Sequence, residues 1–221
     1  MDKTPWAAGA AGGAKAKNND MMRICFVRHG ETDWNIEQRF QGQIDLALNA
    51  NGQQQASALG RFFSGRSADA LYSSDLLRAR ETAEPIGEVL SLPVITRQAL
   101  RERHFGRCEG LTFDEIALRY PDDAQAIVCH DPEYASPGGE SRRQHQERIL
   151  NFVDSLATIH FGQTIVLVTH GGALDIVYRR ARNLPTHSPR DYPIPNAGIN
   201  WISIEGGRWL IESWGDTAHL A

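Results

Sequence analysis

Short apolar runs alternate along this chain with longer segments whose apolar residues recur at helical spacing. The clearest short runs are Ile24–Val27 and Ile165–Val168, which have the length of strands. Leu76, Ala79 and Ala83 begin one of the helical patterns. This alternation is typical of a mostly parallel sheet with helices on both faces. The sequence therefore predicts an α/β fold built as a three-layer sandwich.

The same patterns give each element an expected range. Strands are expected at 23–27, 68–72, 93–96, 164–169, 199–204 and 208–212. Helices are expected at 53–64, 76–90, 113–119, from 141 to about 159, and from 171 to about 182. We expect Ser73-Ser74-Asp75 to cap the second helix and Ile159 to face the core. The last two strands flank Gly206-Gly207, so they should form a C-terminal hairpin.

Residues 1–20 differ in composition from the rest of the chain. Nine of these twenty residues are Ala or Gly, and we expect a flexible tail there. No linker-like break interrupts residues 21–221, so a single domain is expected over that range. No apolar run approaches the roughly 18 residues that a membrane span needs. The three cysteines are odd in number and form no C-x-x-C pair, which fits a reducing, cytoplasmic setting.

Lysine usage excludes several classes of chemistry. From Asn18 onward the chain has twenty arginines and no lysine. Schiff-base, P-loop and kinase-type mechanisms all require a lysine in the folded body, so they are excluded. The net charge of -4 also argues against a nucleic-acid partner. Codon usage can account for the arginine total, yet guanidinium groups also suit the paired oxygens of phosphate or carboxylate.

Two of the expected strands end in a histidine followed by a glycine. One strand leads into Arg28-His29-Gly30 and the other into Thr169-His170-Gly171. In such sheets, ligands bind at the carboxyl ends of the strands. The glycines allow close approach of a ligand, and the free N–H groups of a following helix favour an anion. With Arg28 and with Arg78, which follows another strand, the two histidines indicate a pocket for a phosphoryl group.

The segment Arg28–Thr32 is the first of a series of motifs in a fixed order. The others are Trp34-Asn35, Arg39-Phe40-Gln41-Gly42, Ser73–Ala79, Leu100–Gly106, Pro137–Ser141 and Thr169-His170-Gly171-Gly172. This ordered set resembles the histidine phosphatase superfamily, which has the phosphoglycerate-mutase-like fold. The resemblance covers about residues 22–219 and is specific because it rests on several motifs rather than on Arg-His-Gly alone.

The resemblance implies a catalytic arrangement. His29 is expected to be the nucleophile that forms a phosphohistidine. Arg28, Arg78 and His170 are expected to surround the phosphoryl oxygens and stabilise their charge. Glu102 is expected to protonate the leaving oxygen and then to activate water. No metal and no other cofactor is expected, because arginines and imidazoles supply the positive charge.

Asn35, Gln41, Gly42 and Gly171 are expected to add phosphate-binding donors. Simpler structural interpretations stay open: Asn35 and Gln41 can be turn residues, and Glu102 can be paired with a neighbouring arginine. The two motif histidines can likewise be structural, and Arg78 can be a solvated helix arginine. The remaining histidines are expected at the surface or in packing; they are His104, His130, His145, His160, His187 and His219.

The same family fold serves hydrolases and mutases, and several features favour hydrolysis. The mutases have a tyrosine where Phe105 stands and a lysine where Phe113 stands. They also carry an arginine pair in a substrate-covering insertion, whereas Arg142-Arg143 resembles the start of a helix. The second histidine is followed by Gly-Gly, as in phosphatase relatives. The segment from 102 to 141 is short and leaves little cover to exclude water.

The sequence therefore predicts a metal-independent phosphomonoester hydrolase that acts on small phosphorylated metabolites. Alternatives are a 2,3-bisphosphoglycerate-dependent phosphoglycerate mutase and a non-catalytic module that binds a phosphorylated ligand. Residues 36–44 and 111–137, which include Phe40, Phe113, Tyr120 and Tyr134, are expected to border the mouth of the site. A homodimer is possible by analogy with other α/β enzymes.

Overall fold

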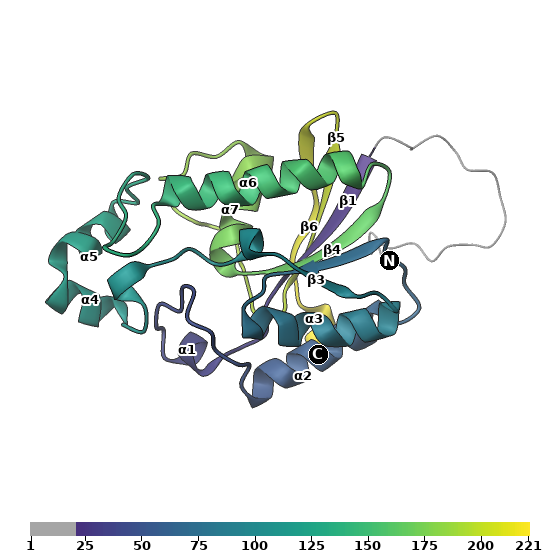
Figure 1. Ribbon diagram of the computed structural model, residues 1–221, viewed down its shortest axis with the longest axis horizontal. Helices are drawn as coiled ribbons and strands as arrows, with labels where there is room; N and C mark the ends of the chain where they lie inside the picture. Colours follow the sequence, from purple (N-terminus) through teal and green to yellow (C-terminus); the bar gives the residue numbers. More distant parts are fainter. Residues whose placement is uncertain (1–20) are drawn as a thin grey trace.

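The computed structural model describes residues 21–221, and the tail expected at residues 1–20 lies outside the described residues. Its centre is a six-stranded sheet with the strand order β3-β2-β4-β1-β5-β6 (Figure 1). The strands are β1 (Met21–Arg28), β2 (Ala70–Ser73), β3 (Val94–Thr96), β4 (Thr164–Thr169), β5 (Ile199–Glu205) and β6 (Arg208–Asp216). The first four are mutually parallel, and the β5–β6 hairpin pairs antiparallel with β1. The mostly parallel sheet and its C-terminal hairpin are therefore confirmed.

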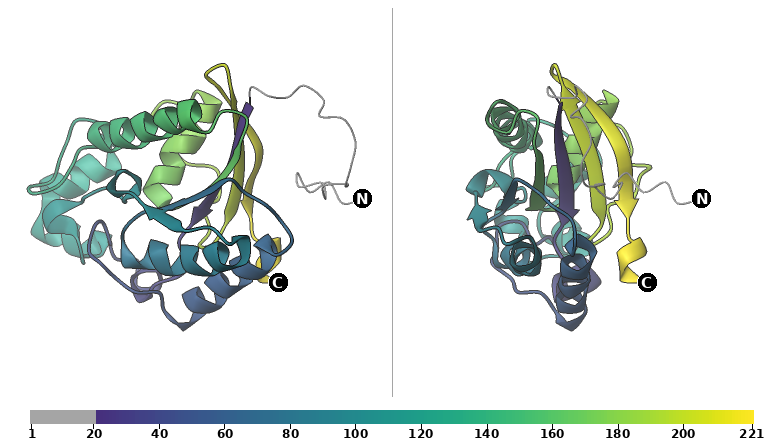
Figure 2. Two further views of the ribbon diagram at one scale, coloured as in Figure 1. Left: turned by 45° about the vertical axis from the view of Figure 1, so that its right-hand side comes forward. Right: turned by 90° about the vertical axis from the view of Figure 1, so that its right-hand side faces the viewer.

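Helices cover both faces of the sheet. One face packs against α2 (Ala50–Phe63) and α3 (Leu77–Leu90), and the other packs against α6 (Arg142–Ile159) and α7 (Gly171–Arg182). The short helices are α1 (Asp33–Ile36), α4 (Phe113–Arg119) and α5 (Pro121–Val128), and 3-10 turns span Gln98–Leu100, Gly106–Cys108 and Ala218–Leu220. Figure 2 shows α4 and α5 on the side of the molecule away from the β5–β6 hairpin. The predicted three-layer α/β sandwich is confirmed.

Strand β1 contributes to both halves of the core. Its side chains alternate across the sheet, so Ile24 and Phe26 face the cluster that α6 and α7 complete. Cys25 and Val27 face the cluster that α2 and α3 complete. All four side chains are buried, which explains the continuous apolar run of a strand covered on both faces.

The start of α3 differs from the prediction. Leu76, not the Ser73-Ser74-Asp75 segment, occupies the N-cap position, and Asp45 Oδ1 accepts from the backbone N–H of Leu77 at the start of the helix. Asp75 instead accepts two hydrogen bonds from the Arg101 guanidinium, at 2.7 and 2.6 Å. The ion pair with Arg101 is bidentate and joins two opposite charges, and it engages both oxygens of Asp75.

Two further details were wrong or missed. Ile159 is the last residue of α6 and is 66% exposed, so it does not face the core. Helix α5 was not expected after Pro121, yet proline is well suited to the first turn of a helix because that turn needs no N–H donor. None of the helices within residues 21–221 has the length and apolar character to cross a membrane.

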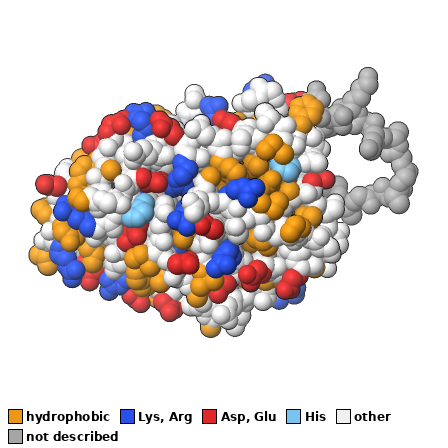
Figure 3. All heavy atoms as spheres, in the orientation of Figure 1, with side chains coloured by type: hydrophobic (Ala, Val, Ile, Leu, Met, Phe, Trp, Pro, Cys, Tyr) orange, Lys and Arg blue, Asp and Glu red, His pale blue; other side chains and the backbone are white. Residues whose placement is uncertain are grey.

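The surface seen in Figure 3 mixes acidic and basic side chains. Hydrophobic side chains gather there between the carboxyl-terminal half of α6 and the edge strand β3. Phe161, which follows α6, is 58% exposed. The homodimer and the single-domain boundary at residues 21–221 stay predictions.

Candidate active site

The register of the two central strands brings the two motif histidines together. Arg28 of β1 pairs with Thr169 of β4, so the next residue of each strand lies at the same edge of the sheet. The ring centroids of His29 and His170 are 5.1 Å apart, and the rings are inclined by 55°. Both side chains are buried. This pairing is the one that the sequence predicted.

The hydrogen bonding of His29 fixes its tautomer. Its Nδ1 lies 2.7 Å from the carbonyl oxygen of Gly30, and a carbonyl can only accept, so Nδ1 carries the proton. Burial, followed by the charges of Arg78 and Arg28, holds the pKa of His29 well below its usual value. The ring is therefore neutral near pH 7, with its lone pair on Nε2, which is the state a nucleophile requires.

The ring nitrogens of His170 have no hydrogen-bond partner in the part of the chain that the structure describes. Both nitrogens are buried. Burial and the nearby Arg78 charge hold the pKa of His170 well below its usual value. Buried polar atoms are nearly always satisfied in folded proteins, so these two nitrogens indicate that a ligand completes the site.

Arg28 and Arg78 bring positive charge to the same place. Arg78 is fully buried and donates to the carbonyl oxygens of Gly42 and Ile44, at 2.7 and 2.9 Å. Arg28 donates to the carbonyl oxygen of Ile194 at 2.6 Å. Burial is the main reason that each pKa is lowered to about 10, which still leaves both groups charged near pH 7. Within residues 21–221 neither arginine forms an ion pair with a carboxylate, so both charges are available to an anion.

Three further predicted residues line the same cavity of about 380 Å³. Asn35 accepts at Oδ1 from the backbone N–H of Thr32 and from Asn196 Nδ2, at 3.0 and 3.2 Å, which leaves its own Nδ2 as a donor. The Oε1 atom of Gln41 is buried without a partner in the described part of the chain. The Gly42 carbonyl accepts from Arg78, so this residue positions the arginine.

Glycine is required at one of the two glycine positions expected in the site. Gly42 has a φ of +52°, and a Cβ there would lie 1.9 Å from Glu109 Oε1. Gly171 begins α7, and the atom nearest to its hypothetical Cβ is Arg28 Nε at 3.6 Å. A larger side chain would therefore fit at position 171, whereas position 42 excludes one.

Glu102 is held by backbone donors rather than by an arginine. Its Oε1 accepts from the N–H of Arg103 at 2.8 Å, and its Oε2 accepts from the N–H of Gly172 at 2.9 Å. Arg101 pairs with Asp75 instead. The carboxylate lines the cavity that also holds His29, so the structure brings together all five residues expected to carry the chemistry.

His145 is a site residue that sequence reasoning missed. It was expected at the surface or in packing; it is buried, and beyond packing its Nε2 lies 4.0 Å from Glu102 Oε1. Burial is the main reason that the pKa of His145 lies well below its usual value. Its spacing of four residues from Ile149 along α6 placed it on the buried face, and that signal could have identified it.

Asn196 is a second missed residue. Its Nδ2 donates to the carbonyl oxygen of His29 at 3.0 Å and to Asn35 Oδ1 at 3.2 Å. It lies in the loop that precedes β5, where no periodic pattern marks a side chain as functional. Its contacts tie this loop to the one that carries the nucleophile candidate.

The expected mouth of the site is only partly confirmed. Phe40 lines the cavity, as predicted for residues 36–44. Phe113 is 39% exposed and lines neither this cavity nor the one beside it. Tyr120 packs against a small cluster of buried residues outside the site, and Tyr134 lines a separate small cavity.

The donor set offers little to a metal ion. Residues 21–221 contain no group of three or more His, Cys, Asp or Glu side chains that could ligate one. The cavity is instead lined by Arg28, Arg78 and the neutral imidazole of His29, and the ring of His170 lies beside that of His29. Such groups can stabilise the charge of a phosphoryl transition state without a metal.

A comparison with protein-family models supports this interpretation. The model described as "Histidine phosphatase superfamily (branch 1)" matches residues 24–217, which includes every site residue named above.

Individual proteins give a consistent result. The chain is 37% identical over 205 residues to "Phosphoglycerate mutase-like protein 4" of Arabidopsis thaliana, covering 91% of this chain and 88% of that protein. It is 36% identical over 206 residues to "Metal-independent phosphoserine phosphatase" of the same organism, covering 92% and 85%. A solved structure, "Bacillus stearothermophilus YhfR", superposes with a TM-score of 0.83 at 32% identity, covering 90% of this chain and 100% of that one.

Proposed function

Because this chain belongs to branch 1 of the histidine phosphatase superfamily, we propose that it hydrolyses phosphate monoesters of small metabolites through a phosphohistidine on His29. The observation that carries the proposal is the state of His29. Its neutral ring has its lone pair on Nε2 and lies beside two charged arginines, neither of which forms an ion pair with a carboxylate within residues 21–221. A phosphoryl group bound by those arginines would meet the nucleophile directly.

In the first step, His29 Nε2 attacks phosphorus and the bond from phosphorus to the ester oxygen breaks. The leaving oxygen takes a proton from Glu102, which lines the same cavity. Arg28 and Arg78 stabilise the charge that spreads over the other three oxygens. His170 supplies two ring nitrogens that no residue among 21–221 satisfies.

In the second step, the Glu102 carboxylate accepts a proton from water as the water oxygen attacks phosphorus. The phosphorus–nitrogen bond breaks, and the pair of electrons returns to His29 Nε2. Inorganic phosphate leaves, with His29 again neutral and Glu102 again protonated. The two backbone N–H donors hold the carboxylate in place through both steps.

Transfer to water is favoured over transfer to a second metabolite by the residues at the mouth. Phe105 has no hydroxyl group to hold an acceptor, and the helices between Glu102 and α6 are the short α4 and α5. One relative's name describes a metal-independent phosphoserine phosphatase, which agrees with hydrolysis without a metal. Another relative's name is phosphoglycerate mutase-like, so a mutase is the competing proposal.

Phosphate release in EDTA tests this proposal. The substrates are p-nitrophenyl phosphate, 3-phosphoglycerate and a sugar phosphate, with His29→Ala as the inactive comparison. A parallel sample follows the conversion of 3- to 2-phosphoglycerate with 2,3-bisphosphoglycerate added. Release that persists in EDTA and is lost in His29→Ala supports the hydrolase. Isomerisation without release supports the mutase, and neither activity supports a module that only binds a phosphorylated ligand.

A further inference from the structure

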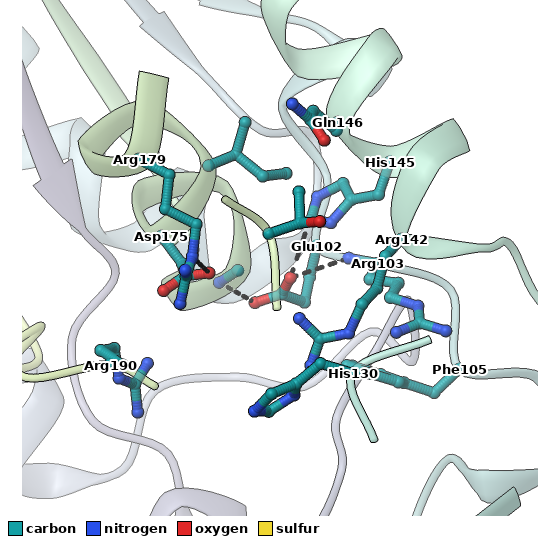
Figure 4. A pocket seen from close by; sticks show the side chains of 13 residues that line it. Glu102, Arg103, Phe105, His130, Arg142, His145, Gln146, Asp175, Arg179 and Arg190 are labelled. Carbon is teal, nitrogen blue, oxygen red and sulfur yellow. Dashed lines mark hydrogen bonds and ion pairs between the residues drawn. The ribbon is translucent and has the colours of Figure 1, made fainter. Parts of the chain in front are cut away.

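A second cavity adjoins the one that holds His29. Its volume is about 290 Å³, and Glu102, Phe105 and Arg190 line both cavities. Figure 4 shows Glu102 inside this second cavity, with its carboxylate held by the hydrogen bonds described above. Since Glu102 protonates the leaving oxygen in the proposed reaction, the group attached to that oxygen would extend from Glu102 into the second cavity.

The wall of this cavity is rich in positive charge. Arg103, Arg142 and Arg190 line it, and none of the three forms an ion pair with a carboxylate in the described residues. In Figure 4, Arg190 lies on the opposite side of the pocket from Arg103 and Arg142. A group bound between them would be approached by guanidinium side chains from two sides.

The carboxylates of the lining offset these charges only in part. The two that line the cavity are Glu102 and Asp175. Asp175 accepts from Arg179 Nε at 2.8 Å and from the Tyr192 hydroxyl at 2.7 Å. Glu102 accepts from backbone N–H groups. Asp175 therefore matches Arg179, and a surplus of positive charge is left around Glu102.

The partners of Arg103 and Arg142 are neutral. Arg103 donates to the carbonyl oxygens of Glu140 and Tyr134, at 3.0 and 3.2 Å. The Nη2 of Arg142 lies 2.9 Å from His130 Nδ1. The Nε atom of Arg142 is buried and has no hydrogen-bond partner among residues 21–221. These contacts orient the guanidinium groups without neutralising them.

The environment of both arginines is costly for a cation. Burial, followed by repulsion from Arg142, lowers the pKa of Arg103 to about 10. Burial also lowers the pKa of Arg142; the Asp175 carboxylate opposes this shift, and the charges of Arg179 and Arg190 add to it. Arg142 is in addition the first residue of α6, whose first turn holds no acidic side chain. A helix N-terminus carries partial positive charge, so this position favours an anion over a cation.

We propose that this second cavity binds a further anionic group, a carboxylate or a second phosphate, on the leaving-group part of the substrate. The enzyme then prefers phosphate monoesters whose leaving group carries another acidic group over monoesters of the same size whose leaving group carries none. This inference rests on the proposed function, since it uses Glu102 to locate the leaving oxygen. It also gives Arg142 a role that its place at the start of a helix did not suggest.

Matched substrates test the inference directly. O-phosphoserine differs from phosphoethanolamine by one carboxylate, and 3-phosphoglycerate differs from glycerol 3-phosphate in carrying a carboxylate in place of an alcohol. Fructose 1,6-bisphosphate and fructose 6-phosphate make the same comparison for a second phosphate. We expect kcat/KM to favour the acidic member of at least one pair by about tenfold or more, a ratio that a charge-assisted contact can supply. The pairs also distinguish a carboxylate from a phosphate as the preferred anion.

Arg142→Gln and Arg143→Gln form a matched pair of variants. Arg143 is the next residue of α6, but it is exposed and paired with Glu133. We expect Arg142→Gln to reduce the ratio of kcat/KM between acidic and neutral members by about tenfold, whereas Arg143→Gln keeps the wild-type ratio. Binding of the same pairs to His29→Ala, measured by calorimetry, gives the comparison without turnover.

The outcomes separate this inference from the proposed function. If the wild-type enzyme hydrolyses both members of every pair equally well, the second anion site is contradicted while the hydrolase stands. The same conclusion follows if Arg142→Gln lowers kcat/KM for the acidic and the neutral member of each pair by the same factor. If no ester is hydrolysed, the proposed function fails, and equal affinities of acidic and neutral members for His29→Ala would then overturn the anion site as well.

Discussion

The imidazole rings of His29 and His170 lie 5.1 Å apart at the carboxyl ends of β1 and β4. Their closeness follows from the parallel register of the two strands, in which Arg28 pairs with Thr169. Burial, together with the positive charge of Arg78, keeps both rings neutral near pH 7 by lowering their pKa values. Two neutral rings beside two charged arginines fit the proposed binding of a dianionic phosphoryl group, with His29 in the protonation state that the proposed nucleophile requires.

Replacement of the nucleophile should abolish turnover. We expect His29→Ala to reduce kcat by about 10³-fold or more, since removal of a nucleophile costs that much or more in comparable enzymes. His187→Ala is the control, because His187 is exposed and lines neither cavity. Circular dichroism would establish that both variants are folded. Retention of more than a tenth of the activity in His29→Ala would contradict the assignment.

Glu102→Gln should change the dependence of rate on the leaving group. A glutamine cannot donate the proton that a poor leaving oxygen needs, so alkyl phosphates should lose about 10²-fold or more in kcat. p-Nitrophenolate leaves without protonation, so p-nitrophenyl phosphate should lose much less in the first step. Burst kinetics would show whether the second step has become limiting. A uniform loss in the first step across all substrates would mean that another group donates the proton.

Gly172→Ala should displace the Glu102 carboxylate by direct steric contact. A Cβ at this position would lie 2.2 Å from Glu102 Oε1 and 3.1 Å from His145 Cε1, so the carboxylate must move. The higher helix propensity of alanine, worth about 1 kcal/mol, should offset the cost of moving the carboxylate. The free energy of unfolding should therefore change little. We expect kcat for alkyl phosphates to fall by about tenfold or more, measured beside urea unfolding curves. Unchanged kcat would show that the carboxylate position is not critical.

Stability should fall as the medium becomes acidic. Burial holds the pKa values of His29, His145 and His170 below their ordinary value in the folded protein, whereas the unfolded chain titrates near pH 6.5. The unfolded state therefore binds more protons below about pH 6.5, and this part of the stability is complete only above that pH. Each neutral histidine should cost up to about 1.4 kcal/mol per pH unit as the pH falls through that window.

Urea unfolding between about pH 7.5 and pH 5.5 measures that slope. His145→Asn should make the slope shallower, because one of the three buried imidazoles is removed. His187→Asn, at an exposed position, should leave the slope as it is in the wild type. Equal unfolding free energies at both ends of this range would contradict neutral histidines in the folded site.

The sequence was most informative where a local pattern was enough to predict a single strand or helix. The apolar runs that end in His29 and His170 predicted two buried parallel strands, and the structure places them side by side. Arg78 was expected because it follows a strand; it is buried, and its charge lowers the pKa values of both His29 and His170. In each case a local pattern predicted the element. The tendency of α/β sheets to bind ligands at the carboxyl ends of their strands then predicted that these residues share one crevice.

Contacts between distant segments could not be predicted in the same way. Asp75 looked like a helix cap, yet it pairs with Arg101, 26 residues later. Asn196 reaches His29 across 167 residues from an irregular loop. Arg142 fitted its role as a first helical residue, and only the tertiary structure shows that it also lines the cavity beside Glu102. Such pairings depend on the assembled fold rather than on spacing along the chain.

The central claim is that His29 carries the phosphoryl group during turnover. Incubation with a radiolabelled phosphate monoester in EDTA, followed by denaturing quench and peptide mapping, would test this claim most directly. A phosphohistidine at His29 should give a label that is stable in alkali, labile in acid, confined to the peptide with His29 and absent from His29→Ala. A label on another residue, or one retained in His29→Ala, would contradict it.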